Sequence, residues 1–174
     1  MTQPPAKILH LLASLDIAPA RVAQKSLLFQ PEPPELVVAA LGDDGREHRL
    51  TRAAAAAWRA MSAVALADGV TLKIVSAFRS VERQAEIVRA KLARGILIDA
   101  ILEVSAPPGY SEHHTGRAID VMTDGVPALE LEFERTAAFR WLLANAARFG
   151  FFLSYPEGNA HGYAYEPWHW CHKA

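Results

Sequence analysis

Apolar residues recur along the chain at two spacings, one typical of helices and the other of strands. Helical spacing is clearest in the alanine-rich run after Thr51, a good N-cap, and in residues 136–149 before Gly150. Further helices are predicted at 7–28, where Pro19 interrupts, at 81–94 after Ser80, and at 96–102. Within residues 136–149 the spacing predicts an inner stripe of Phe139, Leu142, Leu143 and Ala146.

Short β-branched and apolar runs bounded by turn residues predict strands. Residues 42–45 read Gly-Asp-Asp-Gly, which is turn chemistry and favours a hairpin between the runs on either side. The runs predicted to be strands are residues 36–41, 47–50, 71–78, 117–122, 151–155 and 167–172. Helices therefore cluster outside a small, mostly antiparallel set of strands, which predicts the α+β class.

Length and charge narrow the possible functions. A chain of 174 residues suits one domain with a sizeable core. Its 18 basic and 19 acidic residues nearly cancel, so no positive field is available to bind nucleic acid or an anionic membrane. The longest apolar run, residues 53–67, is mostly alanine and contains Arg59, so we expect no transmembrane segment.

The N-terminus has at most a weak resemblance to an export signal. Lys7 precedes the apolar run 8–15, and residues 18–20 have the small-x-small form of a cleavage site, but His10 interrupts the run. We expect a cytoplasmic protein, with the periplasm or cell envelope as the alternative if this signal is used.

Histidines and tyrosines gather in the C-terminal part of the chain, where five of the seven histidines and three of the four tyrosines lie within the last 62 residues. Cys171 is the only cysteine, so any metal must be held by His, Asp or Glu. The segment 111–120 contains His113 and Asp120, and Gly116 allows the loop between them to double back. Taken alone, these residues fit a salt-bridged structural loop equally well.

A second cluster covers residues 166–170. On a strand, Trp168 and Trp170 face one way, as core residues would, and His169 faces the other way with Cys171, which we interpret as a small buried hydrophobe. Glu166 belongs to the turn before the strand. A buried structural histidine beside a surface glutamate is the alternative. Together the two clusters offer two histidines, an aspartate and a free carboxylate, the minimum set for a catalytic zinc hydrolase.

These motifs resemble a known family. The pattern Ser111-x-His113-x-x-Gly116-x-Ala118-x-Asp120, followed by Glu166-x-Trp168-His169 and preceded by Ser76-x-x-Arg79-Ser80, is similar to the VanY-type D-alanyl-D-alanine carboxypeptidases. That family belongs to a wider group that includes the lysostaphin-type endopeptidases, D-Ala-D-Ala dipeptidases and the hedgehog N-terminal domain. The resemblance covers about residues 50–172. It implies a carboxypeptidase domain over 50–174, with residues 1–49 as an N-terminal extension packing on it.

The resemblance also implies a role for each site residue. Zinc (Zn2+) would be bound by His113, Asp120 and His169, with Glu166 as catalytic base. Arg79 would grip the free C-terminal carboxylate of the substrate, and Gln84 and Ser111 would contact substrate or, alternatively, only pack on the helix and fix the loop. Phe78 stands where the family often has tyrosine, which changes specificity rather than metal binding.

The function so implied is a zinc-dependent carboxypeptidase that removes a terminal D-alanine from a peptidoglycan stem peptide or muropeptide, acting as a monomer. A dipeptidase or endopeptidase with the same chemistry remains an alternative, as does a zinc-bearing wall-binding domain without turnover. Other residues have simpler interpretations. We expect Trp58 and Trp141 in the core, His114 near the metal site or exposed, and His161 in a loop as a structural residue, with a place in the cleft as the alternative.

Overall fold

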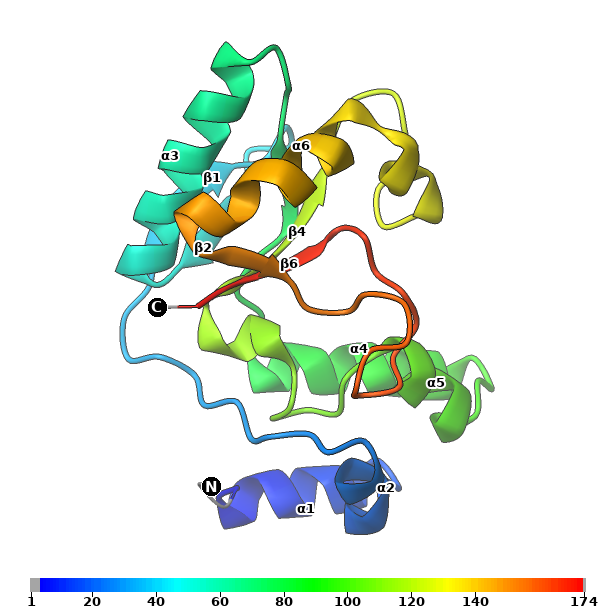
Figure 1. The fold of residues 1–174 in the computed structure, drawn as a ribbon. Helices are drawn as coiled ribbons and strands as arrows, with labels where there is room; N and C mark the ends of the chain where they lie inside the picture. The colour runs from blue at the N-terminus through cyan, green and yellow to red at the C-terminus, as the bar shows by residue number, and fades with distance from the viewer. Residues whose placement is uncertain (1–3, 174) are drawn as a thin grey trace.

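The computed structural model, which describes residues 4–173, has a four-stranded antiparallel sheet at its centre (Figure 1). The strand order is β3-β4-β6-β5, and a separate antiparallel hairpin, β1-β2, lies beside α3. This arrangement confirms the α+β prediction. The strands are β1 (Val37–Leu41), β2 (Glu47–Leu50), β3 (Lys73–Ser76), β4 (Ala118–Met122), β5 (Phe151–Leu153) and β6 (His169–His172).

The helices begin where the sequence offers caps. The Thr51 hydroxyl accepts a hydrogen bond from Ala54 N, and the Ser80 hydroxyl accepts one from Arg83 N, as predicted. No helix within residues 4–173 has both the length and the hydropathy needed to cross a bilayer. The α-helices are α1 (Ala6–Ser14), α2 (Pro19–Gln24), α3 (Arg52–Ala67), α4 (Val81–Ala93), α5 (Ile98–Val104) and α6 (Ala137–Asn145), and the 3-10 helices are η1 (Glu112–Thr115), η2 (Leu131–Arg135) and η3 (Ala146–Phe149).

The prediction of one helix over residues 136–149 is wrong in two respects. The α-helix ends at Asn145 and continues only as the 3-10 helix η3 before Gly150, whose φ is 76°. Leu143 is not on the inner stripe, because its side chain is 57% exposed. Trp141 is buried instead and donates from Nε1 to Asp68 Oδ2 at 2.8 Å, which turns the buried side of α6 away from Leu143.

Three strands, β3, β5 and β6, are shorter than predicted by two residues or more, because their ends leave the sheet to form loops. After β3, Phe78 N donates to Arg49 O and Arg79 N to His113 O, so the chain turns towards other partners. Residues 154–155 and 167–168 likewise lie outside β5 and β6. These loops lie around the candidate site, where a regular strand would have buried the polar groups.

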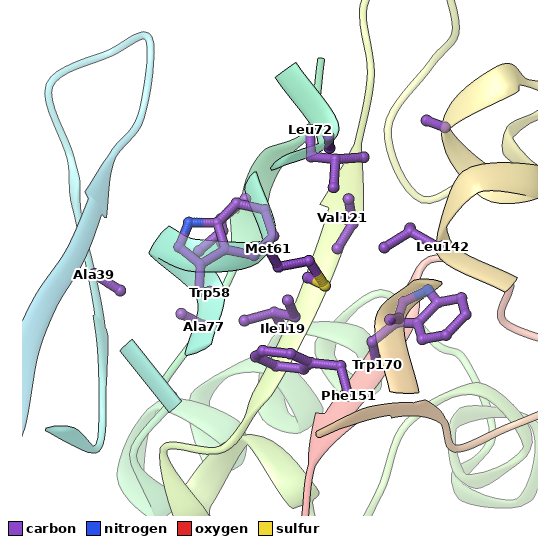
Figure 2. Packing of buried hydrophobic residues seen from close by; sticks show 14 of the residues in the cluster. Ala39, Trp58, Met61, Leu72, Ala77, Ile119, Val121, Leu142, Phe151 and Trp170 are labelled. Carbon is purple, nitrogen blue, oxygen red and sulfur yellow. The ribbon is translucent and has the colours of Figure 1, made fainter. Parts of the chain in front are cut away.

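The main core lies between one face of the four-stranded sheet and the helices α3 and α6. Figure 2 shows Ile119 and Val121 of β4 and Trp170 of β6 packed with Trp58 and Met61 of α3. Burial of side chains of this size contributes about 1.5–3 kcal/mol each. Because side chains alternate along a strand, Asp120 and His169 must lie on the opposite face of the sheet.

A second core joins the first two helices to α4 and α5, on the far side of that opposite face (Figure 1). Apolar side chains of α1 and α2 meet Val81, Ala85 and Val88, which form one side of α4. Glu32 accepts a hydrogen bond from Val81 N at 2.6 Å, at the start of this helix. The first part of the chain thus supports α4 from behind.

Candidate active site

Asp120 and His169 lie opposite each other on two paired strands, and η1 brings His113 up to both. Asp120 and His169 are register partners in the β4–β6 pair, with His169 Nδ1 3.0 Å from Asp120 Oδ1. His113 Nε2 lies 3.1 Å from Asp120 Oδ2. The candidate ligand atoms of these three buried residues are all within 4.8 Å of one another, so the group could hold a metal ion.

The η1 loop reaches this position through a glycine. Gly116 has a φ of 63°, which the left-handed region allows readily only for glycine. A Cβ on Gly116 would lie 2.6 Å from Leu36 Cδ2 and 3.3 Å from Thr51 N, so a larger residue would also clash. The tight return of the chain places His113 beside Asp120, seven residues later.

The outer nitrogen of each imidazole is held by a second contact. His113 Nδ1 lies 2.7 Å from Ala77 O, which only accepts, so this nitrogen carries the proton. His169 Nε2 lies 3.0 Å from Glu112 Oε2. His113 Nε2 and His169 Nδ1 are therefore left facing Asp120. Two such nitrogens and a carboxylate are a donor set that suits zinc, so the residues fit this metal.

Glu112 is a residue of the site that sequence reasoning missed. Its Oε2 accepts a hydrogen bond from the Ser154 hydroxyl at 2.6 Å as well as the contact with His169. Burial works to raise the pKa of Glu112, but the hydrogen bond from His169 and its charge outweigh burial and lower the pKa to about 2. The acid directly precedes His113 in the sequence, but nothing in the sequence pairs it with a histidine 57 residues later.

Glu166 lies beside this group and lines the same cleft. Its Oε2 is 3.9 Å from His169 Nδ1. Two backbone hydrogen bonds of 3.1 Å fix its position: Glu166 N donates to Tyr155 O, and His169 N donates to Glu166 O. Burial, together with the negative charge of Asp120, raises the pKa of Glu166 to about 7 despite the opposing charge of His169. A carboxylate with this pKa can both take and release a proton near neutral pH.

Arg79, Gln84 and Ser111 line the same cleft, which has a volume of about 380 Å³. The Arg79 side chain is not in an ion pair with any residue of 4–173, and its buried Nε has no hydrogen-bond partner. Gln84 donates from Nε2 to Ala106 O at 2.6 Å and leaves its buried Oε1 without a partner. The Ser111 hydroxyl accepts from His113 N at 3.3 Å, so it fixes the η1 loop in this structure.

Aromatic side chains form other walls of the cleft that the sequence reasoning did not assign. The Tyr155 ring lies 4.6 Å from the His169 ring, and the buried Tyr163 hydroxyl has no partner. Trp168, which we predicted to be a core residue only, packs on the core and also lines the cleft. The surplus of tyrosines in the C-terminal part of the sequence was the one available signal for this wall.

The remaining histidines and the cysteine have structural environments. His114 is completely buried, with Nδ1 2.6 Å from Arg79 O and Nε2 accepting from Gly109 N, so it joins two loops of the cleft and is not exposed. His161 does not line the cleft, and its Nδ1 lies 3.2 Å from Lys25 O. Cys171 is buried on the sheet, as expected.

Comparison with known proteins gives a consistent family. The family described as VanY, D-alanyl-D-alanine carboxypeptidase, matches residues 47–174. A D-alanyl-D-alanine carboxypeptidase of Enterococcus faecalis is 37% identical over 116 residues, which is 61% of this chain and 41% of that protein. A bifunctional D-Ala-D-Ala dipeptidase and carboxypeptidase, VanXYC of Enterococcus gallinarum, is 31% identical and covers 79% of this chain and 73% of its own length. The chain spans less than half of the first curated relatives that it matches.

Solved structures show the same similarity. The LdcB LD-carboxypeptidase superimposes with a TM-score of 0.73 at 32% identity, over 81% of this chain and 69% of the other. A vancomycin-resistance D,D-pentapeptidase VanY, solved as a variant with Zn(II), gives a TM-score of 0.64 at 30% identity, over 86% of this chain and 88% of the other. VanYB in complex with D-alanine-D-alanine gives a TM-score of 0.65 at 29% identity, over 85% of this chain and 86% of the other.

Proposed function

This chain belongs to the VanY family of D-alanyl-D-alanine carboxypeptidases, and from that premise we propose that it is a zinc-dependent carboxypeptidase. Its substrate would be a peptidoglycan stem peptide or muropeptide, from which it removes the C-terminal D-alanine. One observation carries this proposal: a possible metal-binding group, a carboxylate with a pKa of about 7 and a buried arginine without a counterion line one cleft.

His113 Nε2, Asp120 and His169 Nδ1 would hold the zinc ion. When bound, zinc polarises the scissile carbonyl and lowers the pKa of water towards about 7. The chain contributes a rigid setting for these ligands, because Asp120 and His169 sit on paired strands and the second nitrogen of each imidazole is fixed by Ala77 O or Glu112.

Glu166 would act as the catalytic base. It takes the proton of the attacking water at its carboxylate and delivers it to the nitrogen of the departing amino acid. Its position beside His169 supports this role, since the carboxylate faces the metal-binding group without belonging to it.

Arg79 would bind the C-terminal carboxylate of the substrate. A planar guanidinium matches a carboxylate through two parallel hydrogen bonds, and the buried Arg79 has no anionic partner in the described chain to compete for them. The bonds from Arg79 N to His113 O and from His114 Nδ1 to Arg79 O tie its backbone to the metal-binding loop. This connection ties the proposed anchor to the loop that carries His113. Gln84 and Ser111 would contact the substrate nearby.

The similarity to LdcB makes an L,D-carboxypeptidase the second candidate, since that structure has the higher TM-score. Both activities release one terminal D-alanine. They differ in whether the preceding residue is a D-alanine, as in a pentapeptide, or an L-configured centre, as in a tetrapeptide.

The test is incubation of the zinc-loaded protein with a stem pentapeptide and a stem tetrapeptide, each with a free and an amidated C-terminus, followed by mass spectrometry. We expect loss of one alanine from a free C-terminus only, abolished by a chelator and restored by zinc. Release from the pentapeptide alone supports D,D-cleavage, and release from the tetrapeptide alone supports L,D-cleavage. Equal cleavage of amidated peptides, or no cleavage of any, would contradict the proposal.

We also propose that residues 1–49 are an extension packing on a carboxypeptidase domain of 50–174, and that the protein acts as a monomer. The contacts of α1 and α2 with α4 and α5 support the first part. A monomer mass by light scattering at assay concentration is the expected result.

A further inference from the structure

Helix α4 presents a row of three side chains to the cleft. Gln84, Ile87 and Lys91 are spaced three and four residues apart, so they lie on one side of the helix, and all three line the cleft. The other side of α4 is buried against α1 and α2. The row therefore ends in a positive charge at a place that the roles assigned above do not use.

The environment of Lys91 does not supply a counterion. Its ammonium donates to the Ser105 hydroxyl at 2.7 Å and makes no ion pair with a carboxylate in residues 4–173. Burial, followed by the positive charge of Arg79, lowers the pKa of Lys91, while Glu166 opposes this change. A neutral hydroxyl orients the ammonium but leaves its charge uncompensated.

The cleft as a whole favours an anionic ligand. The charged side chains among its lining residues are Arg79 and Lys91, which are positive, and Asp120 and Glu166, which are negative. A bound divalent cation would balance the two acids and leave the charges of Arg79 and Lys91 in excess. One substrate carboxylate at Arg79 would neutralise only part of that positive charge.

The spacing suits a second carboxylate in the same peptide. Lys91 is seven residues along α4 from Gln84, which corresponds to about 10 Å of helix. An extended peptide covers about 3.3 Å per residue, so this span is about three residues. The Lys91 ammonium can thus meet a side group well before the C-terminus of a peptide whose end lies near Arg79 and Gln84.

We propose that Lys91 is a specificity-determining residue that binds a second carboxylate of the stem peptide, besides the C-terminal one. This inference rests on the proposed carboxypeptidase function. Stem peptides offer such a carboxylate at two places: the α-carboxylate of γ-linked D-glutamate at the second position, and the side-chain carboxylate of diaminopimelate at the third. Amidation removes the first, and lysine at the third position removes the second.

The experiment compares two pairs of stem peptides. One pair has diaminopimelate or lysine at the third position, and the other has D-isoglutamate or D-isoglutamine at the second. The kcat/KM for D-alanine release is measured with zinc-loaded wild type, Lys91→Met, Lys91→Arg and Arg94→Met. Arg94 is an exposed residue that caps the same end of α4, so its variant removes the same charge outside the cleft.

We expect wild type to prefer the carboxylate-bearing member of one pair by roughly 10- to 100-fold, which is the usual effect of a hydrogen bond between charged groups. Lys91→Met should abolish this preference mainly through KM, whereas Lys91→Arg and Arg94→Met should retain it. The pair that responds identifies the source of the carboxylate. Because the ratio is measured within one preparation, a partly unfolded variant does not alter it.

Two negative results have separate meanings. If wild type releases no D-alanine from any of these peptides, the carboxypeptidase proposal itself fails. If wild type cleaves them but shows no preference, or if Lys91→Met keeps the wild-type preference, the assignment of Lys91 is wrong and the carboxypeptidase proposal stands.

Discussion

Two regions of the cleft differ in how their buried polar atoms are paired. One is the candidate metal-binding end; the other, which we call the α4 wall, is α4 together with Arg79 just before it and the loop that contains Tyr163. At the metal-binding end, each nitrogen of His113 and His169 has a carbonyl or carboxylate oxygen within hydrogen-bond distance. Along the other walls, Arg79 Nε, Gln84 Oε1 and the Tyr163 hydroxyl are buried without a partner. Buried polar groups are seldom left unpaired, because each costs about 1–3 kcal/mol.

This difference shows in which part of the site the protein pairs its own buried polar atoms without a substrate. The metal-binding end is built on paired strands and holds its ligand atoms in place before any ligand arrives. The α4 wall leaves donors and acceptors free, and a substrate that pairs with them recovers the free energy that their burial costs. The first region would therefore set the rate of the chemical step, and the second would set affinity and specificity.

The largest expected effect is at Glu166, where the two regions meet. Glu166→Gln removes the proposed base but keeps the shape of the side chain, so kcat should fall by roughly 10²–10⁴-fold. Zinc content measured by atomic emission should stay at one ion per chain, because Glu166 lies outside the metal-binding group. Near-full activity of the variant would show that the proton is carried by another group.

Arg79 tests the α4 side of the comparison. Arg79→Met should lower kcat/KM for peptides with a free C-terminus by roughly 10²–10³-fold, because it leaves a buried substrate carboxylate unpaired. Weak cleavage of an amidated peptide, if measurable, should not change. Arg83→Met is the matched control, since Arg83 is exposed in the same segment and pairs with Glu86. Equal losses on free and amidated peptides would mean that Arg79 supports the fold rather than the substrate.

Glu112 tests the metal-binding side. Glu112→Gln weakens the contact that holds His169 Nε2, so zinc affinity should fall by roughly 10- to 100-fold in a competition assay with a fluorescent chelator. Ser154→Ala, which removes only the hydroxyl that donates to Glu112, should give a smaller loss in the same direction. Unchanged zinc affinity in Glu112→Gln would show that the strands alone orient His169.

Some of this site could be predicted from the sequence because the relevant information is local. The alternation along β4 and β6 separates Asp120 from Ile119 and His169 from Trp170, so the polar face of the sheet follows from a period of two. The helix caps at Thr51 and Ser80 could likewise be predicted, because each depends only on residues within one helical turn. The four-stranded order did not follow from these patterns, since β6 lies between β4 and β5 through contacts distant in sequence.

What the sequence did not supply depends on long-range contacts. Glu112 meets His169 only when η1 folds over β6, and the cleft wall combines α4 with the loop that contains Tyr163. The inner stripe of α6 was misjudged at Leu143 because the bond from Trp141 to Asp68 joins residues 73 apart. Which residues share a cleft is a property of tertiary packing, and helical spacing alone leaves several choices open.

The smallest expected effect concerns the stability of the metal-free protein against pH. Burial works to lower the pKa of His169, but hydrogen bonds to Asp120 and Glu112 outweigh it and raise the pKa to about 10. His169 therefore contributes stability that is fully present below its ordinary pKa of 6.5 and is lost as the pH rises towards 10. Glu112, with a pKa of about 2, contributes stability that is present above 4.5 and is lost as the pH falls towards 2.

The contribution of His169 and Glu112 should accordingly make the metal-free protein most resistant to urea between about pH 4.5 and 6.5. In Glu112→Gln, the free energy of unfolding should depend less on pH below 4.5 and should be lower on the alkaline side than in wild type. Glu157→Gln, which changes an exposed acid, should leave the pH dependence unchanged. The measurement is the urea concentration at the unfolding midpoint, taken in a chelating buffer at about pH 3, 5.5 and 9. If Glu112→Gln keeps the wild-type profile, the charged pair at the metal-binding end does not stabilise the fold, and the contrast with the α4 wall loses its energetic basis.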